Sequence, residues 1–551
     1  MPAPSDDRLD SWKEIAAYVR RGVRTVRRWE NEEGLPVHRH VHRALGSVYA
    51  FKSEIDAWRQ SGRRRPAAAA AVVPASPGTS GRFAGAEKSI AVLPFTNLST
   101  DPENEYFADG LTDEVTADLS KVRALRVTSR TSAMRFKGTA KDCRTIAREL
   151  GVRYILEGSV RRAGRRLRIT AQLVDAGTDH HLWADKYDGD VEDVFAFQER
   201  LARVIVDALA LELSADEDRR LAERPIRDVH AYECYLRARQ ELWRWRKDAI
   251  DHAIKLLHNG LAIVGENASL YAALGLAHLQ YREAGIDFGE GPLREAEVCV
   301  RKASALAPDS AAGRQLQGWI HYARARIQDA VRELKAALEL EPNRADTLLL
   351  LSYCYLISGR VRAARPLIDR LLAVDPLTPM TRCLPGLADA LEGHLAAAVE
   401  PYRQMFEMDP GNPMARLFYV WTLALNRRGP EIEALVAGFP VEARDEVPAR
   451  IASFLANALA GDPRAASAAL TPEIEALATA ADLFPRFLAQ GYALAGMPEP
   501  ALHWLAIAVE RGFINHPFLA RHDPFFEGLR DDPRFQELLE RVRRRWESFE
   551  A

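Results

Sequence analysis

The sequence has few cysteines and no long apolar run, and these absences exclude several classes of protein. Its five cysteines stand singly in 551 residues, without a C-x-x-C pair, so neither a disulfide framework nor a zinc knuckle is expected. No stretch approaches the roughly 20 apolar residues that a membrane-spanning helix needs, and the acidic N-terminus has no apolar signal segment. We therefore expect a protein of the cytoplasm with no membrane partner.

Signatures of catalysis and cofactor binding are also missing. The sequence has no G-x-x-x-x-G-K-[ST], G-x-G-x-x-G or H-E-x-x-H motif. His38, His40 and His42 alternate as on one face of a strand, but no cysteine or carboxylate beside them completes a metal site. Several carboxylates form no dyad or triad by their spacing, and turn and capping roles explain them better: Asp109, Asp113, Glu114, Asp185 and Asp188. We expect no catalytic residue, cofactor or metal, and therefore not an enzyme.

The length and composition predict several soluble domains. Apolar residues make up 47% and charged residues 28% of the chain, and the net charge is only −2. Residues 62–87 are rich in Ala, Pro, Gly and Ser without a helical or strand period, which is typical of a flexible linker. The predicted order is an N-terminal module at 1–61, the linker at 62–87, a middle domain at 88–222 and a helical region at 225–545.

The N-terminal module gathers positive charge in "RRGVRTVRRWE". Ser11 and Glu14 form a capping-box pattern before a helix whose apolar face holds Ile15, Ala16 and Val19. A turn at Gly22 and a second helix follow, on which an apolar face would pack inward and the arginines would point outward. The alternative is a solvated helix face, although such faces usually mix charge signs within one turn.

Helix, turn, basic helix, basic ribbon and closing helix over roughly residues 9–60 resemble the winged helix-turn-helix of the MerR and phage-excisionase group. The resemblance implies that double-stranded DNA is the partner and that a homodimer binds paired half-sites. Arginine side chains match guanine edges and phosphate oxygens, and they gain affinity by releasing counterions. The DNA-binding residues expected from this resemblance are Arg20, Arg21, Arg24, Thr25, Arg27, Arg28, Arg39 and Arg43.

The middle domain alternates strand and helix signals and then changes to a period of two. "SIAVLPF" predicts a strand, "FADGLTDEVTADLSKV" an amphipathic helix, and "VRYILEGSVRR" and "RLRITAQLVDA" two strands joined at Gly164. This pattern predicts an α/β domain with a mixed sheet. These segments, with "HLWADKYDG", resemble the TolB amino-terminal-like domain of bacterial signalling chains, a resemblance that implies no defined activity. The basic hairpin "RRAGRRLR" is explained better as a solvated edge than as an anion site.

The helical region carries a repeat of fixed period. Pro308, Pro342, Pro376 and Pro410 follow one another at intervals of 34 residues, and Ala296, Ala330, Ala364 and Ala398 keep the same interval. Small alanines let paired helices approach, and prolines mark the passage to the next unit. The segments 311–344, 345–378 and 379–412 resemble tetratricopeptide repeats, which form an all-α solenoid closed by a C-terminal cap.

By that resemblance, the first helix of each unit lines a groove for a protein partner. The expected groove residues are Gln315, Trp319, Tyr322, Leu349, Tyr353, Leu356 and Leu387. Apolar and aromatic anchors of this kind bind a partner helix or an extended peptide. The alternative is that the superhelix or the middle domain buries these residues.

The sequence thus favours a multidomain fold made of a small winged helix-turn-helix, an α/β mixed-sheet domain and a solenoid. The function expected from it is a DNA-binding transcriptional regulator with a sensing or protein-interaction region. The alternative is a cytoplasmic scaffold in a signalling complex that does not bind DNA, and an enzyme built on the middle domain is the least favoured class.

Overall fold

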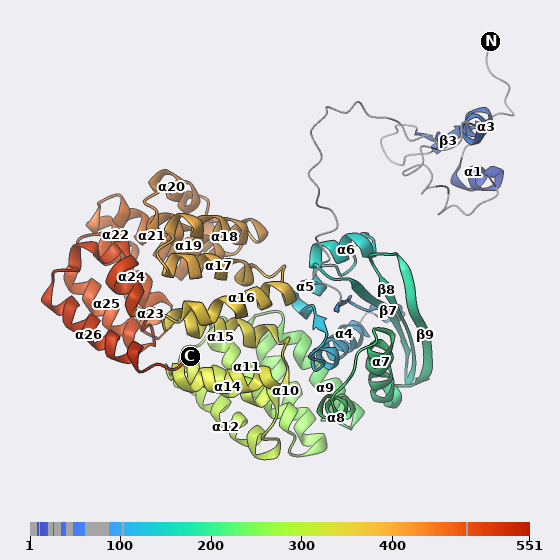
Figure 1. Cartoon of the computed structure of the whole chain (residues 1–551), viewed down its shortest axis with the longest axis horizontal. Helices are drawn as coiled ribbons and strands as arrows, with labels where there is room; N and C mark the ends of the chain where they lie inside the picture. The colour runs from blue at the N-terminus through green and yellow to red at the C-terminus, as the bar shows by residue number, and fades with distance from the viewer. Residues whose placement is uncertain are drawn as a thin grey trace, which may run out of the picture. The chain divides into compact units, whose positions relative to one another are not determined.

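The computed structural model describes residues 8–9, 11–19, 26, 35–39, 48–60, 88–101, 104–480 and 483–551. The chain divides into two compact units, Met1–Thr79 and Ser80–Ala551, which we describe separately (Figure 1). The expected boundary between the middle domain and the helical region lies inside the second unit. The division into two units does not test it, so it stays a prediction. No helix in the described ranges has the length and apolar character that crossing a bilayer requires.

The N-terminal unit combines short strands and helices around a small core. Its elements are β1 (Arg8–Leu9), α1 (Trp12–Val19), β2 (His38–Arg39), β3 (Val48–Phe51) and α3 (Lys52–Gln60). The strands form an antiparallel sheet in the order β1-β3-β2. The Ser11 hydroxyl accepts a hydrogen bond from Glu14 N at 3.2 Å, as the capping pattern predicts. Ile15, Ala16 and Val19 are buried, so the predicted apolar face of α1 is confirmed, and Val26 and Ile55 are fully buried in the same core. A complete winged helix-turn-helix is not shown.

The middle domain contains a mixed sheet, as the strand pattern predicts. Its strands are β4 (Ser89–Val92), β5 (Thr96–Asn97), β6 (Arg126–Val127), β7 (Tyr154–Ala163), β8 (Arg166–Asp175) and β9 (His180–Asp190). The order is β6-β4-β7-β8-β9, with β5 also paired to β7. Pairs made by β4 are parallel, whereas β7, β8 and β9 form an antiparallel meander joined by tight turns.

Helices cover both faces of the central strand β4. The helices are α4 (Glu105–Ser120), α5 (Arg130–Met134), α6 (Cys143–Leu150), α7 (Val194–Ala208) and α8 (Ala215–Ala222), and a 3-10 turn, η2 (Val191–Asp193), precedes α7. Ile90 and Val92 belong to the core formed with α4 and α7, whereas Ala91 and Leu93 belong to the core formed with α6. Successive side chains of a strand point to opposite faces, which explains this alternation.

The rest of the described chain is helical and forms the solenoid (Figure 1). Its α-helices are α9 (Val229–Leu242), α10 (Lys247–Val264), α11 (Ala268–Glu283), α12 (Glu290–Leu306), α13 (Ala311–Ala323), α14 (Ile327–Leu340), α15 (Ala345–Ile357), α16 (Val361–Val374), α17 (Pro379–Leu391), α18 (Leu395–Met408), α19 (Pro413–Leu425), α20 (Gly429–Ala437), α21 (Val447–Leu459), α22 (Pro463–Ala469), α23 (Pro472–Ala480), α24 (Phe484–Leu494), α25 (Pro498–Glu510) and α26 (Pro533–Glu547). Shorter turns are η3 (Val441–Ala443), η4 (Phe518–His522) and η5 (Pro524–Leu529).

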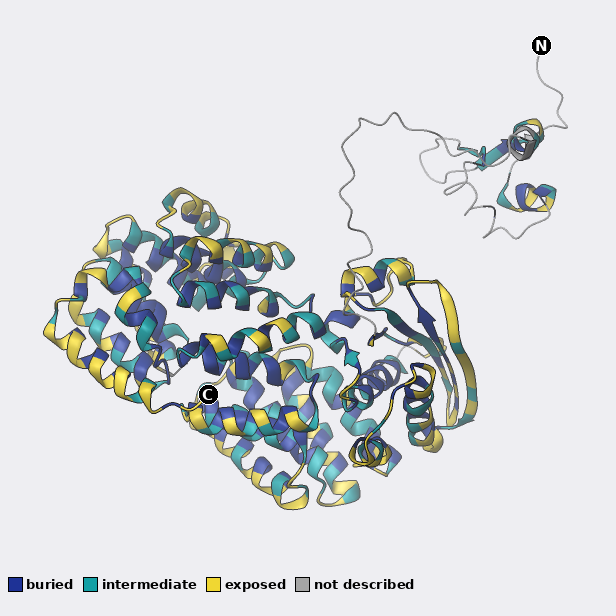
Figure 2. Cartoon of the chain, in the orientation of Figure 1, coloured by how far each residue is buried: buried dark blue, intermediate teal, exposed yellow. Residues whose placement is uncertain are grey.

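The predicted repeats match the observed helix pairs. Helices α13, α15, α17 and α19 begin at residues 311, 345, 379 and 413, so each of the three expected segments holds one helix pair. All four periodic alanines are fully buried: Ala296, Ala330, Ala364 and Ala398. Figure 2 shows buried residues on the facing sides of the paired helices and exposed residues on their outer sides. The tight helix packing that the alanines predict is therefore confirmed.

The middle domain and the solenoid pack against each other within the second unit. The core beneath α4 and α7 continues into the first solenoid helices, where it includes Leu236 and Leu257. The edge strand β6 faces the ends of solenoid helices: Arg126 Nη1 donates to the carbonyl of Ala373 at 2.9 Å, and Asn343 Nδ2 donates to that of Leu125 at 2.8 Å. The first contact gives a donor to a carbonyl at the end of α16. Both contacts place solenoid residues beside β6, at an edge of the sheet that would otherwise be open.

The solenoid curls so that its C-terminal segments contact its middle. Arg360 Nη2 donates to the carbonyls of Trp546 and Phe549 at 2.6 and 2.7 Å. Ile514 N donates to the Ile357 carbonyl at 3.0 Å. The first helices of the regular repeats therefore face residues from the C-terminal end of the array.

Candidate functional site

The predicted DNA-binding side chains lie outside the part of the N-terminal unit that can be described. Arg39 is part of β2, but its side chain is not described. The remaining residues of this prediction fall outside the described ranges: Arg20, Arg21, Arg24, Thr25, Arg27, Arg28 and Arg43. His38 Nε2 lies 2.7 Å from a Glu54 carboxylate oxygen, within hydrogen-bond distance, and the His38 ring stacks on Tyr49, whereas His40 and His42 also lie outside these ranges.

Acidic side chains of the middle domain form ion pairs with basic residues. Asp113 contacts Arg130 at 2.9 Å and Arg239 of α9 at 3.0 Å, and Asp109 contacts Lys137 at 2.5 Å. Two further carboxylates weighed from the sequence pair with arginines as well, Asp185 with Arg200 and Asp188 with Arg168. These pairs join elements of the fold, so they support a structural role for the carboxylates rather than a catalytic one.

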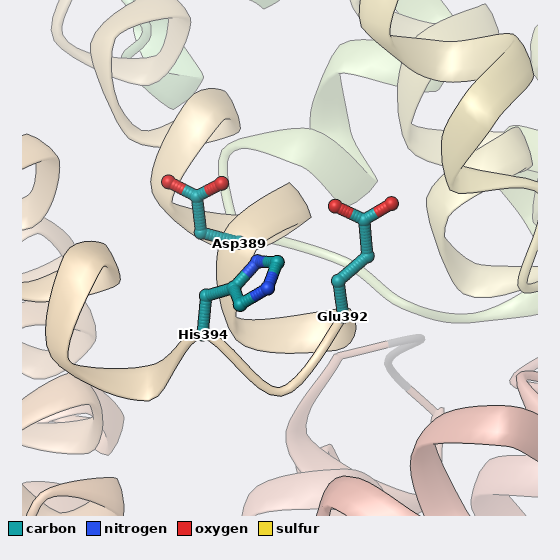
Figure 3. A group of neighbouring side chains, drawn as sticks. All are labelled: Asp389, Glu392 and His394. Carbon is teal, nitrogen blue, oxygen red and sulfur yellow. The ribbon is translucent and has the colours of Figure 1, made fainter.

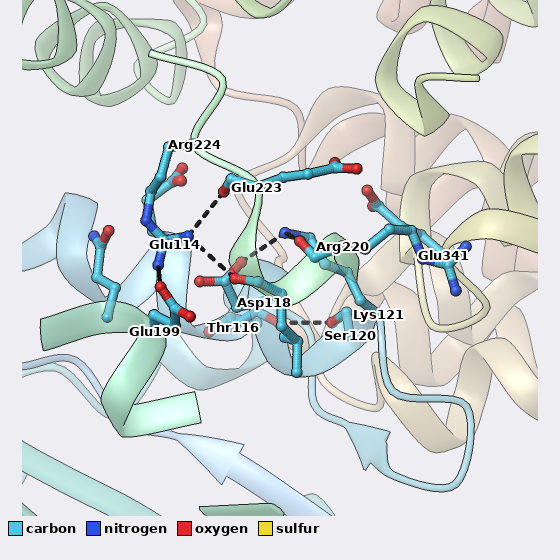
Figure 4. Close-up of polar contacts among 12 residues, drawn as sticks. Glu114, Thr116, Asp118, Ser120, Lys121, Glu199, Arg220, Glu223, Arg224 and Glu341 are labelled. Carbon is cyan, nitrogen blue, oxygen red and sulfur yellow. Dashed lines mark hydrogen bonds and ion pairs between the residues drawn. The ribbon is translucent and has the colours of Figure 1, made fainter. Parts of the chain in front are cut away.

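Glu114 lies on α4 within a crowded group of charges (Figure 4). Burial raises the pKa of Glu114 to about 7, although the Arg239 guanidinium, 3.5 Å away, favours the charged form. Asp118 and Asp113 raise this pKa further by repulsion. Lys121 contacts Asp118 at 2.7 Å and donates to the Arg220 carbonyl at 3.1 Å. The group links α4 to the segment after α7.

The basic hairpin between β7 and β8 is balanced by acidic neighbours. Arg162 pairs with Glu233 of α9 at 2.6 Å, and Arg165 pairs with Glu192 at 2.5 Å. Arg168 forms two hydrogen bonds to Asp188 on the neighbouring strand. The interpretation of this hairpin as charged and solvent-facing fits Arg165 and Arg168, whereas Arg162 is largely buried against α9.

Asp389, Glu392 and His394 lie close enough together to hold a metal ion, around the turn after α17 (Figure 3). However, Arg365 forms ion pairs with both carboxylates, at 2.8 Å to Asp389 and at a shorter distance to Glu392. The guanidinium already pairs with both acidic ligands that a cation would need. The donor set therefore fits an ion-pair network that joins neighbouring repeats better than a metal site.

The groove residues predicted from the sequence divide into two groups. Gln315, Leu356 and Leu387 are 2%, 0% and 4% exposed, so they pack inside the solenoid and are not available to a partner. For these three positions the expected groove exposure is corrected, because the superhelix itself buries them. Tyr322 is also buried, at 8% exposed, whereas Trp319, Leu349 and Tyr353 are partly exposed.

Three aromatic residues of the prediction form a continuous row on α13 and α15. The rings of Trp319 and Tyr322 lie 6.4 Å apart, and those of Tyr322 and Tyr353 lie 6.0 Å apart, both edge to face. We call Trp319, Tyr322 and Tyr353 the aromatic row. Tyr322 and Tyr353 of this row also line a narrow pocket with about 10 Å³ of free space, enough for roughly one water molecule.

The pocket is completed by residues that the sequence analysis did not single out. Tyr322, Tyr353 and Ile357 line one side, and Leu483, Arg486, Arg511 and Phe513, from the segments around α24 and α25, line the other. The sequence pattern could not place these four residues at the pocket, because they lie late in the irregular part of the array. Only the curvature of the solenoid brings them close to α13 and α15. The pocket thus contains two guanidinium groups beside tyrosine and apolar side chains.

Two parts of the chain match known families. Residues 86–204 match the family described as HilA/YgeH-like transcriptional regulator, second domain, and residues 321–380 match the tetratricopeptide repeat. The chain therefore contains tetratricopeptide repeats, beside a domain similar to one of a transcriptional regulator. The MerR-like and TolB-like resemblances are not shown by these matches.

A curated relative shares one segment of the chain. "Putative adenylate cyclase 3" of Rhizobium meliloti (strain 1021) is 46% identical over 194 residues, which are 35% of this chain and 33% of that protein. This chain thus matches about a third of that relative's length.

Solved structures with tetratricopeptide repeats also align to the chain. A protein of Thermus thermophilus is 19% identical over 35% of this chain and 100% of its own, with a TM-score of 0.30. One from Parabacteroides merdae is 13% identical over 44% of this chain and 97% of its own, with a TM-score of 0.33. Scores this low establish no common overall shape, so the repeat identification rests on the family match and the helix pairs.

Proposed function

We propose that the protein is a cytoplasmic, DNA-binding transcriptional regulator in which the N-terminal module binds double-stranded DNA and the solenoid binds a protein partner. In this proposal the module is a winged helix-turn-helix of the MerR and excisionase type, and it binds as a homodimer. The middle domain, for which the TolB-like resemblance remains our proposal, connects the DNA-binding module to the solenoid.

The observation that carries the DNA-binding proposal is the full burial of Val26 within the arginine cluster. A helix has 3.6 residues per turn, so a helix that buries Val26 directs Arg24 and Arg28 to its opposite side. There the two guanidinium groups would be available to phosphates and guanine edges. The match of residues 86–204 to a transcriptional-regulator domain supports the same function.

The test is fluorescence anisotropy of the full chain with labelled duplexes from the region upstream of its own gene, against a scrambled duplex, over a salt series. We expect preference for the native duplex and a negative slope of log affinity against log salt. Replacing Arg24, Arg27 and Arg28 with alanine should weaken binding and make the slope shallower by about one for each phosphate that the protein no longer neutralises. The matched control replaces Arg165 and Arg166, which are 72% and 70% exposed on the hairpin.

Equal binding of both duplexes would contradict regulation by sequence, and no binding at low salt would contradict DNA binding altogether. The second result would favour the scaffold hypothesis, in which the solenoid organises a complex. That hypothesis has its own support, since the curated relative shares only a third of its length with this chain and its name does not refer to transcription. Cyclase activity is not proposed, because the acidic residues considered in the middle domain are committed to ion pairs.

A further inference from the structure

We propose that strand β9 pairs with the β9 strand of a second copy of this chain, antiparallel and centred on Tyr187, so that two sheets join into one. The inference rests on the homodimer of the proposed function and names the surface that forms it. The occupant of this strand edge is a second copy, because the charges along β9 complement those of the same strand in reverse.

β9 is the open edge of the mixed sheet. The opposite edge, β6, lies beside solenoid residues, whereas β9 is the outermost strand on its side (Figure 1). Among the described residues, β9 pairs with β8 alone. None of its eleven residues is buried, and exposed residues follow one another along it (Figure 2). An edge of this length presents a row of N–H and C=O groups to another strand.

The register of the hairpins decides which backbone groups point to the open edge. A two-residue turn joins β7 to β8, so the closing pair Ala163–Arg166 exchanges hydrogen bonds, and bonded pairs alternate from there. Odd-numbered residues of β8 therefore bond to odd-numbered residues of β9, and the bond from Val191 N to the Arg165 carbonyl, at 2.8 Å, continues this pattern. The even-numbered residues direct their N–H and C=O groups outward: Ala184, Lys186, Asp188 and Asp190.

Two of these outward amides bond to side chains near them in the sequence. Lys186 N donates to the Asp185 carboxylate at 2.7 Å, and Asp190 N donates to that of Asp193 at 3.2 Å. Both bonds agree with amides that point away from β8. Since both carboxylates are exposed, the carbonyl of an added strand can replace either bond at little net cost.

The charges of β9 select the register of the pairing. Residues that point outward can face only outward-pointing residues of the partner, so the two-fold axis passes beside a single residue of β9. Centred on Tyr187, the pairing puts Lys186 opposite the partner's Asp188 on one side of the axis and repeats this pair on the other. Centring on Lys186 or Asp188 puts that residue opposite its own copy, and like charges so placed are destabilising.

The regular part of β9 has the same centre. A bulge at Leu182 interrupts the pairing with β8, and the strand ends at Asp190. Between them, Ala184–Asp190 is symmetric about Tyr187, so each of its residues meets one of the partner's. The Tyr187 ring lies 5.4 Å from that of Phe197 on α7. Because the two-fold axis between antiparallel strands is perpendicular to the sheet, α7 of both copies lies on one face of the joined sheet.

Sedimentation velocity of the full chain without DNA, over a concentration series, tests the pairing. We expect a monomer–dimer equilibrium for the wild type. Lys186→Asp and Asp188→Lys each put like charges opposite one another twice, so each should weaken dimerisation by at least about tenfold. Mixed in equal amounts, the two variants should form a heterodimer, because every Asp then faces a Lys. The control is Lys335→Asp on the exposed side of α14, which should dimerise as the wild type does.

Ala184→Pro serves if Asp188→Lys does not fold. It removes an outward N–H without removing a bond to β8, so it should weaken dimerisation and leave the unfolding temperature nearly unchanged. A monomeric wild type at all concentrations overturns the inference, as does a mixture of charge variants that stays monomeric. A dimer that survives Ala184→Pro also overturns it but keeps the homodimer of the proposed function. DNA binding by the same preparations is measured separately, by anisotropy.

A disulfide tests the centre of the pairing. The residue at the axis forms a pair without backbone hydrogen bonds, whose Cα atoms lie about 4.5 Å apart, within the range that a disulfide spans. Tyr187→Cys should therefore cross-link two chains under mild oxidation. Asp185→Cys should not, because it lies opposite the partner's Gly189. Cross-linking at Asp185→Cys and not at Tyr187→Cys overturns the register.

Discussion

The Ser132 hydroxyl donates a hydrogen bond of 2.7 Å to the Asp375 carboxylate, although 243 positions separate the two residues in the chain. Asp375 is 5% exposed and also accepts from Ser129, from Thr378 at 2.9 Å and from Thr381 at 3.0 Å. One carboxylate therefore accepts hydrogen bonds from hydroxyl groups at the start of α5 in the middle domain, in the turn between α16 and α17, and in the first turn of α17. This contact ties the regulator-like domain to the repeats.

Replacing Asp375 with alanine should loosen the junction between the middle domain and the solenoid. The buried hydroxyls lose their common acceptor, which should cost about 3 kcal/mol, and Asp375→Asn should cost less because its amide oxygen still accepts. Hydrogen exchange of peptides covering α5 and the α16–α17 turn is the measurement. Asp369→Ala on the exposed face of α16 is the control, and equal exchange in both variants would contradict the role of Asp375.

Glu114 should make stability fall as the pH rises. Below pH 4.5 this carboxyl is protonated in both states, but between 4.5 and about 7 the unfolded chain releases a proton that the folded chain retains. The free energy of unfolding should thus drop by up to about 3 kcal/mol over that window. Glu114→Gln should remove this drop, as measured by urea unfolding across pH. Exposed Glu149→Gln should keep the wild-type pH profile.

Ala398 tests the close packing of a repeat. It is fully buried on α18, and its carbonyl would lie 2.9 Å from a Cβ added at Gly386 on α17. Ala398→Leu should therefore separate the two helices and cost about 1–3 kcal/mol of local stability. The adjacent Ala397→Leu is exposed and should be nearly neutral. Hydrogen exchange of α17 and α18 compares them, and matching protection in the two variants would contradict a packing limit at Ala398.

Ile55 tests whether DNA binding depends on the folded N-terminal module. Ile55 is fully buried, and Ile55→Ala should cost about 2–5 kcal/mol in a module with a small core. We expect faster proteolysis of the first unit and weaker binding in the anisotropy assay, although every arginine is retained. Exposed Ser53→Ala is the control. If the Ile55→Ala protein is proteolysed faster but binds DNA as tightly as the wild type, the positive charge of an unfolded module is sufficient for DNA binding.

Much of the fold could be predicted from local patterns. The interval of 34 residues located the starts of α13, α15 and α17, and the period-two runs located β7 and β8. Burial of Ile15 and of Ala330 followed from helical periodicity in the same way. Such features depend on which neighbours within one or two turns are apolar, small or unable to continue a helix, and the sequence states this directly.

The sequence by itself determined the repeat and the mixed sheet, whereas the outward placement of the arginine cluster stays a prediction. Only the tertiary structure decided that Leu356 and Leu387 are buried, that Asp375 joins two regions, and that Arg486 faces Tyr322 and Tyr353 across a pocket. The reason is geometric. Each repeat adds a small rotation, and the sum over many repeats decides which distant side chains meet and which groove positions close.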